Sequence, residues 1–409
     1  MRKGTGLLLA LAVCLLLIVL LLALCFAFVG CKNQKTQEYS DTPISSLDAQ
    51  NQFVVMNGFN IQETEKFFFG CGLLENYLHY YDKESHTSGI LCADPSCTHD
   101  TESCWAYVEE GSNLSCYDGK LYFVARDAQS ESNDYYLWRS DLTGTNRERV
   151  KRFDFLNVIV AYNPQRFVIH RGNLYILGSN AIVDAGDPKN RITLLSIPLD
   201  GSEEFTTILD RTVSDSFEVI PRFVENKVYY AEKSSFPNTI KLVSYDIAGK
   251  NTQTLWEGND SDCVWGDFWV TEEEQCYLSG MSHGESVVWK LEGGELVKVF
   301  SREVGNTEEP WIPHLFGGLA VWSSYESEVR YISVKDLQGR TLYEGKLFPQ
   351  TVPGVPGDPN KYQWGIVGGD GEKLIVNLHS FSEQGITSYM LSLDLRDNLK
   401  PTVLWSNEC

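Results

Sequence analysis

Residues 118–124 read DGKLYFV, and residues 136–144 read YLWRSDLTG. Both segments are rich in the apolar and aromatic side chains that favour β-strands, and we interpret them as half-buried antiparallel strands. The second segment ends in Asp141-Leu142-Thr143-Gly144. This is a turn signal, because Gly supplies the positive φ that a tight hairpin requires. The stretch therefore predicts antiparallel strands joined by short polar turns.

The same succession of turn, strand, polar loop, strand and acidic turn recurs along the chain, about every 50 residues. One small sheet cannot bury both of its faces alone, whereas a closed ring of such sheets can. The pattern predicts an all-β protein whose residues 51–409 form a single β-propeller. Seven blades fit best, and six or eight blades are the alternatives. The other copies cover residues 67–91, 171–201 and 225–249, with weaker ones that begin near Glu272, Gly317 and Gly371.

The first 31 residues predict export. Arg2 and Lys3 precede an uncharged apolar run that extends to Cys31. The run is longer than a typical signal peptide core and is long enough to span a bilayer as an apolar helix. Its end, Phe28-Val29-Gly30-Cys31, resembles the lipobox of bacterial lipoproteins, with Phe28 where that motif usually has Leu. We expect lipidation at Cys31, with an uncleaved transmembrane anchor as the alternative.

Either anchor places the rest of the chain on the extracellular face of a bacterial membrane. Residues 32–50 are polar and predict a flexible tether between the membrane and the propeller. The formal net charge of the whole chain is −21. Such a charge argues against nucleic acid as a partner, and it favours solubility at a crowded surface.

Two segments resemble known families. Residues 137–146 look like the strand–turn units of propellers related to the TolB and low-density-lipoprotein-receptor types. Residues 91–100 and Cys104, between the flanking segments 81–84 and 117–122, resemble a signature of surface lipoproteins of Firmicutes. The resemblance implies a propeller fold and an extracytoplasmic location, and it supplies no active-site residues.

A cysteine-rich segment joins the first expected blade to the second. Cys92, Cys97, His99 and Cys104 lie close together in sequence, and Cys116 follows. An exported protein permits disulfides, so we expect a disulfide staple in this segment. Free, inert thiols are a second interpretation. The third is a zinc site, because three thiolates and one imidazole can surround Zn²⁺ tetrahedrally.

The remaining histidines and the aromatic residues between blades are weaker candidates. His283, His314 and His379 lack a metal-binding spacing, and we expect them to be structural. Aromatic rings beside carboxylates in the links between blades could bind a carbohydrate or a cation, or could pack between blades instead. The nominated ligand-binding residues are Trp265, Trp311, Trp364, Asp262, Glu308 and Asp358, with Glu309 and Tyr362 beside them.

No segment matches a phosphate-binding loop, a nucleophile elbow or an HExxH helix. We therefore expect no catalytic residue and no cofactor, apart from zinc at the cysteine-rich segment. The expected function is binding or scaffolding of a glycan, a peptide or an envelope protein. The alternative is a polysaccharide lyase or glycoside hydrolase with a propeller fold, which would need carboxylates or histidines that converge in the mouth of the ring.

Overall fold

The computed structural model divides the chain into two compact units, Met1–Glu38 and Tyr39–Cys409. The described residues all belong to the second unit. They are residues 60–71, 76–108, 114–126, 135–152, 167–184, 187–199, 205–213, 217–235, 238–259, 263–304, 312–326, 329–382 and 385–408. The expected anchor with Cys31 and the expected tether lie outside them.

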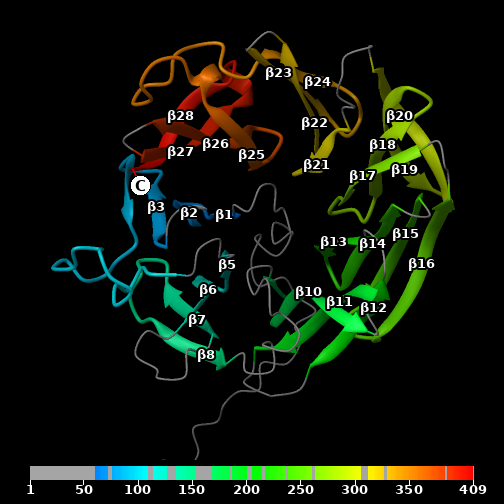
Figure 1. Cartoon of the computed structure of the whole chain (residues 1–409), viewed down its shortest axis with the longest axis horizontal. Coiled ribbons are helices and arrows are strands. Elements are labelled where there is room, and N and C mark those ends of the chain that lie inside the picture. Colours follow the sequence, from blue (N-terminus) through cyan, green and yellow to red (C-terminus); the bar gives the residue numbers. More distant parts are fainter. Residues whose placement is uncertain are drawn as a thin grey trace, which may run out of the picture. The chain divides into compact units, whose positions relative to one another are not determined.

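The second unit contains seven four-stranded antiparallel sheets, so the predicted seven-bladed propeller is confirmed (Figure 1). Each blade is built from four consecutive strands. Blade 1 is β1 (Asn60–Glu63), β2 (Phe67–Cys71), β3 (Leu78–Asp82) and β4 (Thr87–Ile90); blade 2 is β5 (Leu114–Tyr117), β6 (Lys120–Arg126), β7 (Tyr135–Asp141) and β8 (Glu148–Arg152); blade 3 is β9 (Phe167–His170), β10 (Asn173–Asp184), β11 (Asp187–Pro198) and β12 (Thr206–Val213).

The C-terminal four blades repeat this arrangement. Blade 4 is β13 (Phe217–Val224), β14 (Lys227–Ser235), β15 (Asn238–Asp246) and β16 (Asn251–Asn259); blade 5 is β17 (Cys263–Val270), β18 (Cys276–Ser282), β19 (Glu285–Glu292) and β20 (Glu295–Glu303); blade 6 is β21 (His314–Phe316), β22 (Leu319–Glu326), β23 (Val329–Asp336) and β24 (Thr341–Lys346); blade 7 is β25 (Gln363–Gly369), β26 (Lys373–Ser382), β27 (Gly385–Asp394) and β28 (Lys400–Glu408).

The first strands of the blades lie innermost and touch one another. β1 contacts β5 and β25, β5 contacts β9, and β17 contacts both β13 and β21. Asp267 ties three of these inner strands together. It accepts from Arg222 Nη2 in β13 at 3.1 Å and from the Leu315 backbone N–H in β21 at 3.1 Å. Because Arg222 is buried, this ion pair satisfies a charge that would otherwise be costly inside the protein.

Blade 2 shows how the repeated turn fits the fold. The hairpin before β6 has both central residues, Asp118 and Gly119, at positive φ. In the β7–β8 turn, the Gly144 backbone N–H donates to Asp141 O at 2.9 Å, and Gly144 has a φ of +75°. A Cβ at Gly144 would lie 2.7 Å from the Leu91 carbonyl oxygen. Gly144 therefore serves both the turn and the close approach of blade 2 to the segment that follows blade 1.

The ring closes through side chains, because blade 7 takes all four strands from the C-terminal end of the chain. Trp405 of β28 stacks on His79 of β3, with ring centroids 5.9 Å apart. Glu63 of blade 1 forms ion pairs with Lys373 of blade 7 at 3.0 Å and with Lys83 at 2.6 Å. A buried apolar cluster that includes Phe68 and Leu404 completes this contact.

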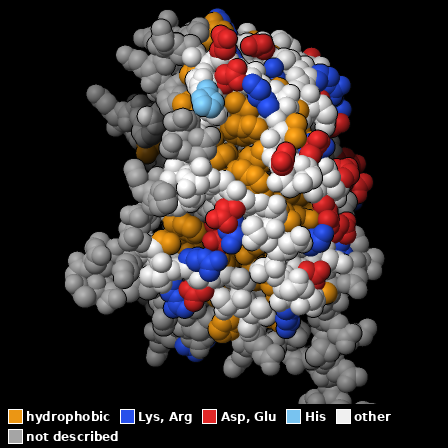
Figure 2. All heavy atoms as spheres, turned by 90° about the vertical axis from the view of Figure 1, so that its right-hand side faces the viewer, with side chains coloured by type: hydrophobic (Ala, Val, Ile, Leu, Met, Phe, Trp, Pro, Cys, Tyr) orange, Lys and Arg blue, Asp and Glu red, His pale blue; other side chains and the backbone are white. Residues whose placement is uncertain are grey.

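The outer strands are more exposed than the inner strands. β16 is mostly exposed. Figure 2 shows the side of the molecule with β16 and β20, where acidic and basic side chains lie around small apolar patches. The only helices in the described ranges are two 3-10 turns, η1 (Pro359–Lys361) and η2 (Leu395–Asp397). No helix in this part of the chain has the length and apolar character of a transmembrane span.

Candidate metal centre

The cysteine-rich segment lies where the sequence places it, between β4 of blade 1 and β5 of blade 2. Short local hydrogen bonds shape it. The Asp94 carboxylate accepts from the Ser96 backbone N–H at 2.8 Å, and the Cys97 backbone N–H donates to the Asp94 carbonyl at 3.2 Å. This turn contains Pro95, a residue that favours turns. His99 follows with a φ of +56°, which turns the chain back toward Cys104.

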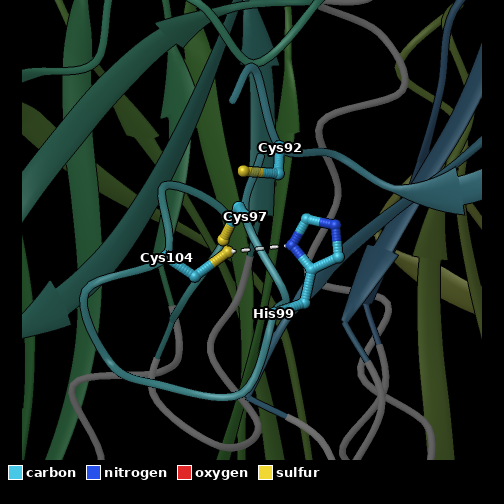
Figure 3. A group of neighbouring side chains, drawn as sticks. All are labelled: Cys92, Cys97, His99 and Cys104. Atoms are coloured by element: carbon cyan, nitrogen blue, oxygen red, sulfur yellow. Dashed lines mark hydrogen bonds between the residues drawn. The ribbon is translucent and has the colours of Figure 1, made fainter. Parts of the chain in front are cut away.

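Four side chains converge in this segment, as Figure 3 shows. The three sulfur atoms and the His99 ligand nitrogen all lie within 4.8 Å of one another. The His99 Nδ1 to Cys104 Sγ distance is 3.4 Å. Cys92, Cys97 and His99 are partly buried, and Cys104 is 3% exposed. Within the described ranges, this is the one group of His, Cys and acidic side chains that could hold an ion.

The expected disulfide staple is not formed in this structure. No disulfide joins Cys92, Cys97 and Cys104. Cys116 takes no part in the cluster. It lies in β5, where burial raises the pKa of its thiol to about 12. The fourth member of the cluster is His99 rather than a fourth sulfur.

Cys104 has an environment suited to a buried ligand. Its Sγ accepts from the Ala106 backbone N–H at 3.4 Å, an arrangement that favours a negatively charged sulfur. Burial raises the pKa of the Cys104 thiol to about 12, and the neighbouring Cys97 and Cys92 thiols add to this shift. A bound cation would favour the ionised form of the Cys104 sulfur.

The end of the segment packs on both blades. Tyr77 pairs with Tyr107 in an isolated antiparallel bridge, and the Leu78 backbone N–H donates to the Ala106 carbonyl at 2.9 Å. Arg147, from the β7–β8 turn of blade 2, donates through Nη1 to the carbonyls of Trp105 at 2.7 Å and Tyr107 at 3.2 Å.

The Arg147 guanidinium also lies 4.3 Å from the ring centroid of Trp138. The sequence alone did not indicate that Arg147 is a partner of this segment. The one sequence feature that could have indicated this role is the position of Arg147 just after the Asp141-x-x-Gly144 turn.

The nominated ligand-binding residues are dispersed. Trp265 is 6% exposed and packs inside the protein against Trp256 and Trp289, with centroid distances of 5.6 and 5.7 Å. These contacts match the alternative expectation, in which the aromatic residue packs between blades. Asp262, Glu308, Glu309 and Trp311 lie outside the described residues.

Asp358, Tyr362 and Trp364 occupy one short stretch at the start of blade 7. Asp358 is exposed, whereas Tyr362 and Trp364 are partly buried. Asp358 caps η1, and its carboxylate accepts from the Asn360 backbone N–H at 3.0 Å. This hydrogen bond is the main reason that the pKa of Asp358 is lowered. These three nominated residues are neighbours along the chain, and Tyr362 and Trp364 both pack against a buried core cluster.

The three histidines occupy separate strands or turns. His283 lies in the β18–β19 turn, and His314 is exposed at the start of β21. His379 lies in β26, where its ring nitrogens are 2.7 Å from Asn377 Nδ2 and 2.8 Å from Ser388 Oγ. Burial lowers the pKa of His379. These contacts agree with the structural role expected for His379.

No protein-family model and no curated protein sequence matches this chain. Many solved structures are similar to it. One described as a prolyl endopeptidase has a TM-score of 0.50 at 12% identity, over 89% of this chain and 52% of that one. An acylaminoacyl peptidase structure has a TM-score of 0.50 at 11% identity, over 85% and 52%. TolB from Acinetobacter baumannii has a TM-score of 0.35 at 11% identity, over 84% and 78%.

The chain spans about half the length of the two peptidase structures. At these identities, the similarity concerns the fold alone. The chain is a seven-bladed β-propeller whose fold is shared with the corresponding half of those peptidases.

Proposed function

We propose that this protein is a non-catalytic binding or scaffolding module, held on the outer face of a bacterial membrane by its N-terminal segment. Its ligand would be a glycan, a peptide or an envelope protein. The apolar run before Cys31 supports the location. The resemblance of residues 77–125 to surface lipoproteins of Firmicutes supports it as well.

The observation that carries the binding role is the link into blade 7. Here an ionised carboxylate and two partly exposed aromatic rings lie on a short stretch of chain that is shaped by local hydrogen bonds. Tyr362 Oη donates to the Pro356 carbonyl at 2.7 Å, and its ring meets that of Tyr389 edge-on at 6.1 Å. Aromatic rings that are fixed before a ligand arrives lose little conformational entropy on binding, and carboxylates add polar contacts. This arrangement suits a sugar ring or a cationic peptide side chain.

A binding screen tests this proposal. The full chain in detergent is applied to glycan and peptide arrays, and the Kd of each hit is measured by titration. We expect Trp364→Ala to weaken binding at least tenfold. Trp105→Ala is the matched control, because Trp105 is 45% exposed and lies on the segment between blades 1 and 2.

Asp358→Asn is a second variant that tests binding without disturbing the fold. It removes the charge but keeps an oxygen that can cap η1. It should weaken binding of cationic ligands and leave the thermal unfolding midpoint nearly unchanged. Unaltered affinity in both Trp364→Ala and Asp358→Asn would move the ligand site elsewhere. Cleavage of a bound glycan or peptide would contradict the non-catalytic role.

A further inference from the structure

We infer that Cys92, Cys97, His99 and Cys104 form a structural zinc site that ties the segment between blades 1 and 2 into a fixed conformation. The ligand atoms are the three Sγ atoms and Nδ1 of His99. Figure 3 shows the imidazole directed toward the sulfurs, with Nδ1 nearest to them.

The first support is the geometry. With a zinc–sulfur distance of about 2.3 Å and a zinc–nitrogen distance of about 2.0 Å, the ligand atoms of a tetrahedral site are about 3.5 to 3.8 Å apart. The Nδ1 to Sγ distance between His99 and Cys104 is 3.4 Å, close to one edge of such a tetrahedron. The longest ligand distance is at most 4.8 Å. A contraction of about 1 Å therefore completes the site.

The second support is the identity of the ligands. Three soft sulfurs and one imidazole suit zinc, whereas calcium, magnesium and manganese prefer oxygen ligands. The protein supplies all four ligands, which is typical of a structural zinc site rather than a catalytic one. A disulfide would use only two of the three sulfurs and would give His99 no function.

The third support is that the tip of the segment has no core of its own. In residues 92–103 no side chain is buried, although Leu91 before them and Cys104 after them are. The local hydrogen bonds of the tip join exposed groups, such as Thr98 Oγ1 to Asp100 Oδ1 at 2.7 Å. Exposed hydrogen bonds of this kind contribute little to stability. A metal ion would supply the stabilisation that apolar burial does not provide in residues 92–103.

The position of Cys104 explains what the ion would fix. Cys104 belongs to a buried apolar cluster with Phe69 of blade 1 and Phe123 of blade 2. The other three ligands lie in the tip and are partly buried, with Cys92 and Cys97 packed against the edge of this cluster. Zinc would therefore connect the tip to the place where blades 1 and 2 meet. It would also hold Ala106 and Val108 in the apolar cluster between these two blades.

The test is metal analysis of the full chain, expressed without added metal and purified in detergent. Inductively coupled plasma mass spectrometry should find one zinc per chain. His99→Ala and Cys97→Ser should each lower this value at least fivefold. Cys276→Ala, a buried cysteine of blade 5, should retain one zinc and serves as the matched control.

Replacement of the metal in the wild-type chain keeps the test independent of the folding of any variant. After chelation and addition of Co²⁺, the visible spectrum should show intense tetrahedral d–d bands and sulfur-to-cobalt charge transfer. Chelation should also expose three additional reactive thiols per chain. A metal-free wild-type chain, a disulfide among Cys92, Cys97 and Cys104 in non-reducing peptide maps, or iron in place of zinc would each overturn the inference.

Discussion

Two connections between neighbouring blades differ in what holds them. The link between blades 6 and 7, residues 347–362, buries Leu347, Phe348, Val352 and Val355. The tip of the segment between blades 1 and 2, residues 92–103, buries no side chain and instead brings together three cysteines and a histidine. A long connection can be ordered by apolar burial or by ligand chemistry, and with the proposed zinc site this propeller would contain one example of each.

The largest expected effect is that of metal removal on the segment between blades 1 and 2. Chelation of the full chain should increase amide hydrogen exchange in residues 92–103 by about tenfold or more, because local opening would no longer cost the metal bonds. Residues 347–362 should exchange at an unchanged rate, because apolar contacts order them. Hydrogen-exchange mass spectrometry with and without zinc checks both. Equal changes in the two connections would contradict the contrast.

The converse perturbation is Val352→Ala. Val352 is 2% exposed, so the loss of two buried methyl groups should lower the free energy of unfolding by about 2 kcal/mol. The zinc content should not change. Chemical denaturation measures the difference, with Val297→Ala as the control because Val297 is 45% exposed. A similar loss of stability in both variants would show that burial in this link is not what matters.

Gly144 and Gly119 form a matched pair for the seam between blades 1 and 2. Both have positive φ, but a Cβ at Gly144 would lie 2.7 Å from the Leu91 carbonyl, whereas one at Gly119 would meet nothing within 4 Å. Gly144→Ala should therefore lower the free energy of unfolding by about 1 to 2 kcal/mol more than Gly119→Ala does. Thermal unfolding of the two variants provides the comparison. Equal losses would mean that the close contact relaxes without cost.

The smallest effect concerns the cap of η1. Asp358→Ala should lower the free energy of unfolding by about 0.5 to 1 kcal/mol, because the Asn360 backbone N–H loses its acceptor. The pKa of Asp358 is lowered in the folded protein, chiefly by this hydrogen bond. The contribution of its carboxylate is therefore complete above the ordinary aspartate pKa and is lost as the pH falls through the lowered value.

Denaturation at neutral pH and at a pH below the folded pKa of Asp358 checks this sign. The difference between wild type and Asp358→Ala should shrink at acid pH. A difference that grows on acidification would contradict the assigned cap.

The sequence was informative where a pattern is local. The apolar and aromatic residues 121–124 and the Asp141-x-x-Gly144 turn predicted strands and hairpins that the structure confirms, and their repetition predicted the number of blades. Residues 121–124 are buried on both faces of the sheet rather than half-buried. The sequence was less informative about the lengths of the strands. β10 and β11 each span 12 residues, well beyond the segments that the pattern marked in blade 3. Strand pairing continues there beyond the alternating pattern, through backbone hydrogen bonds that need no particular side chain.

The candidate sites depended on three-dimensional placement. Spacing singled out Cys92, Cys97, His99 and Cys104, but their convergence depends on a turn at Pro95 and a positive φ at His99 that spacing does not encode. Trp265 was nominated as a ligand-binding residue in a link between blades, with packing as the alternative, and it lies in β17 and packs within the protein. Sequence alternation does not tell which face of a strand meets a neighbouring blade and which meets the ring opening.

X-ray absorption at the zinc edge of the purified full chain tests the central claim most directly. The account predicts a first coordination shell of three sulfurs at about 2.3 Å and one nitrogen at about 2.0 Å. A shell of only nitrogen and oxygen atoms, or the absence of zinc absorption, would contradict it.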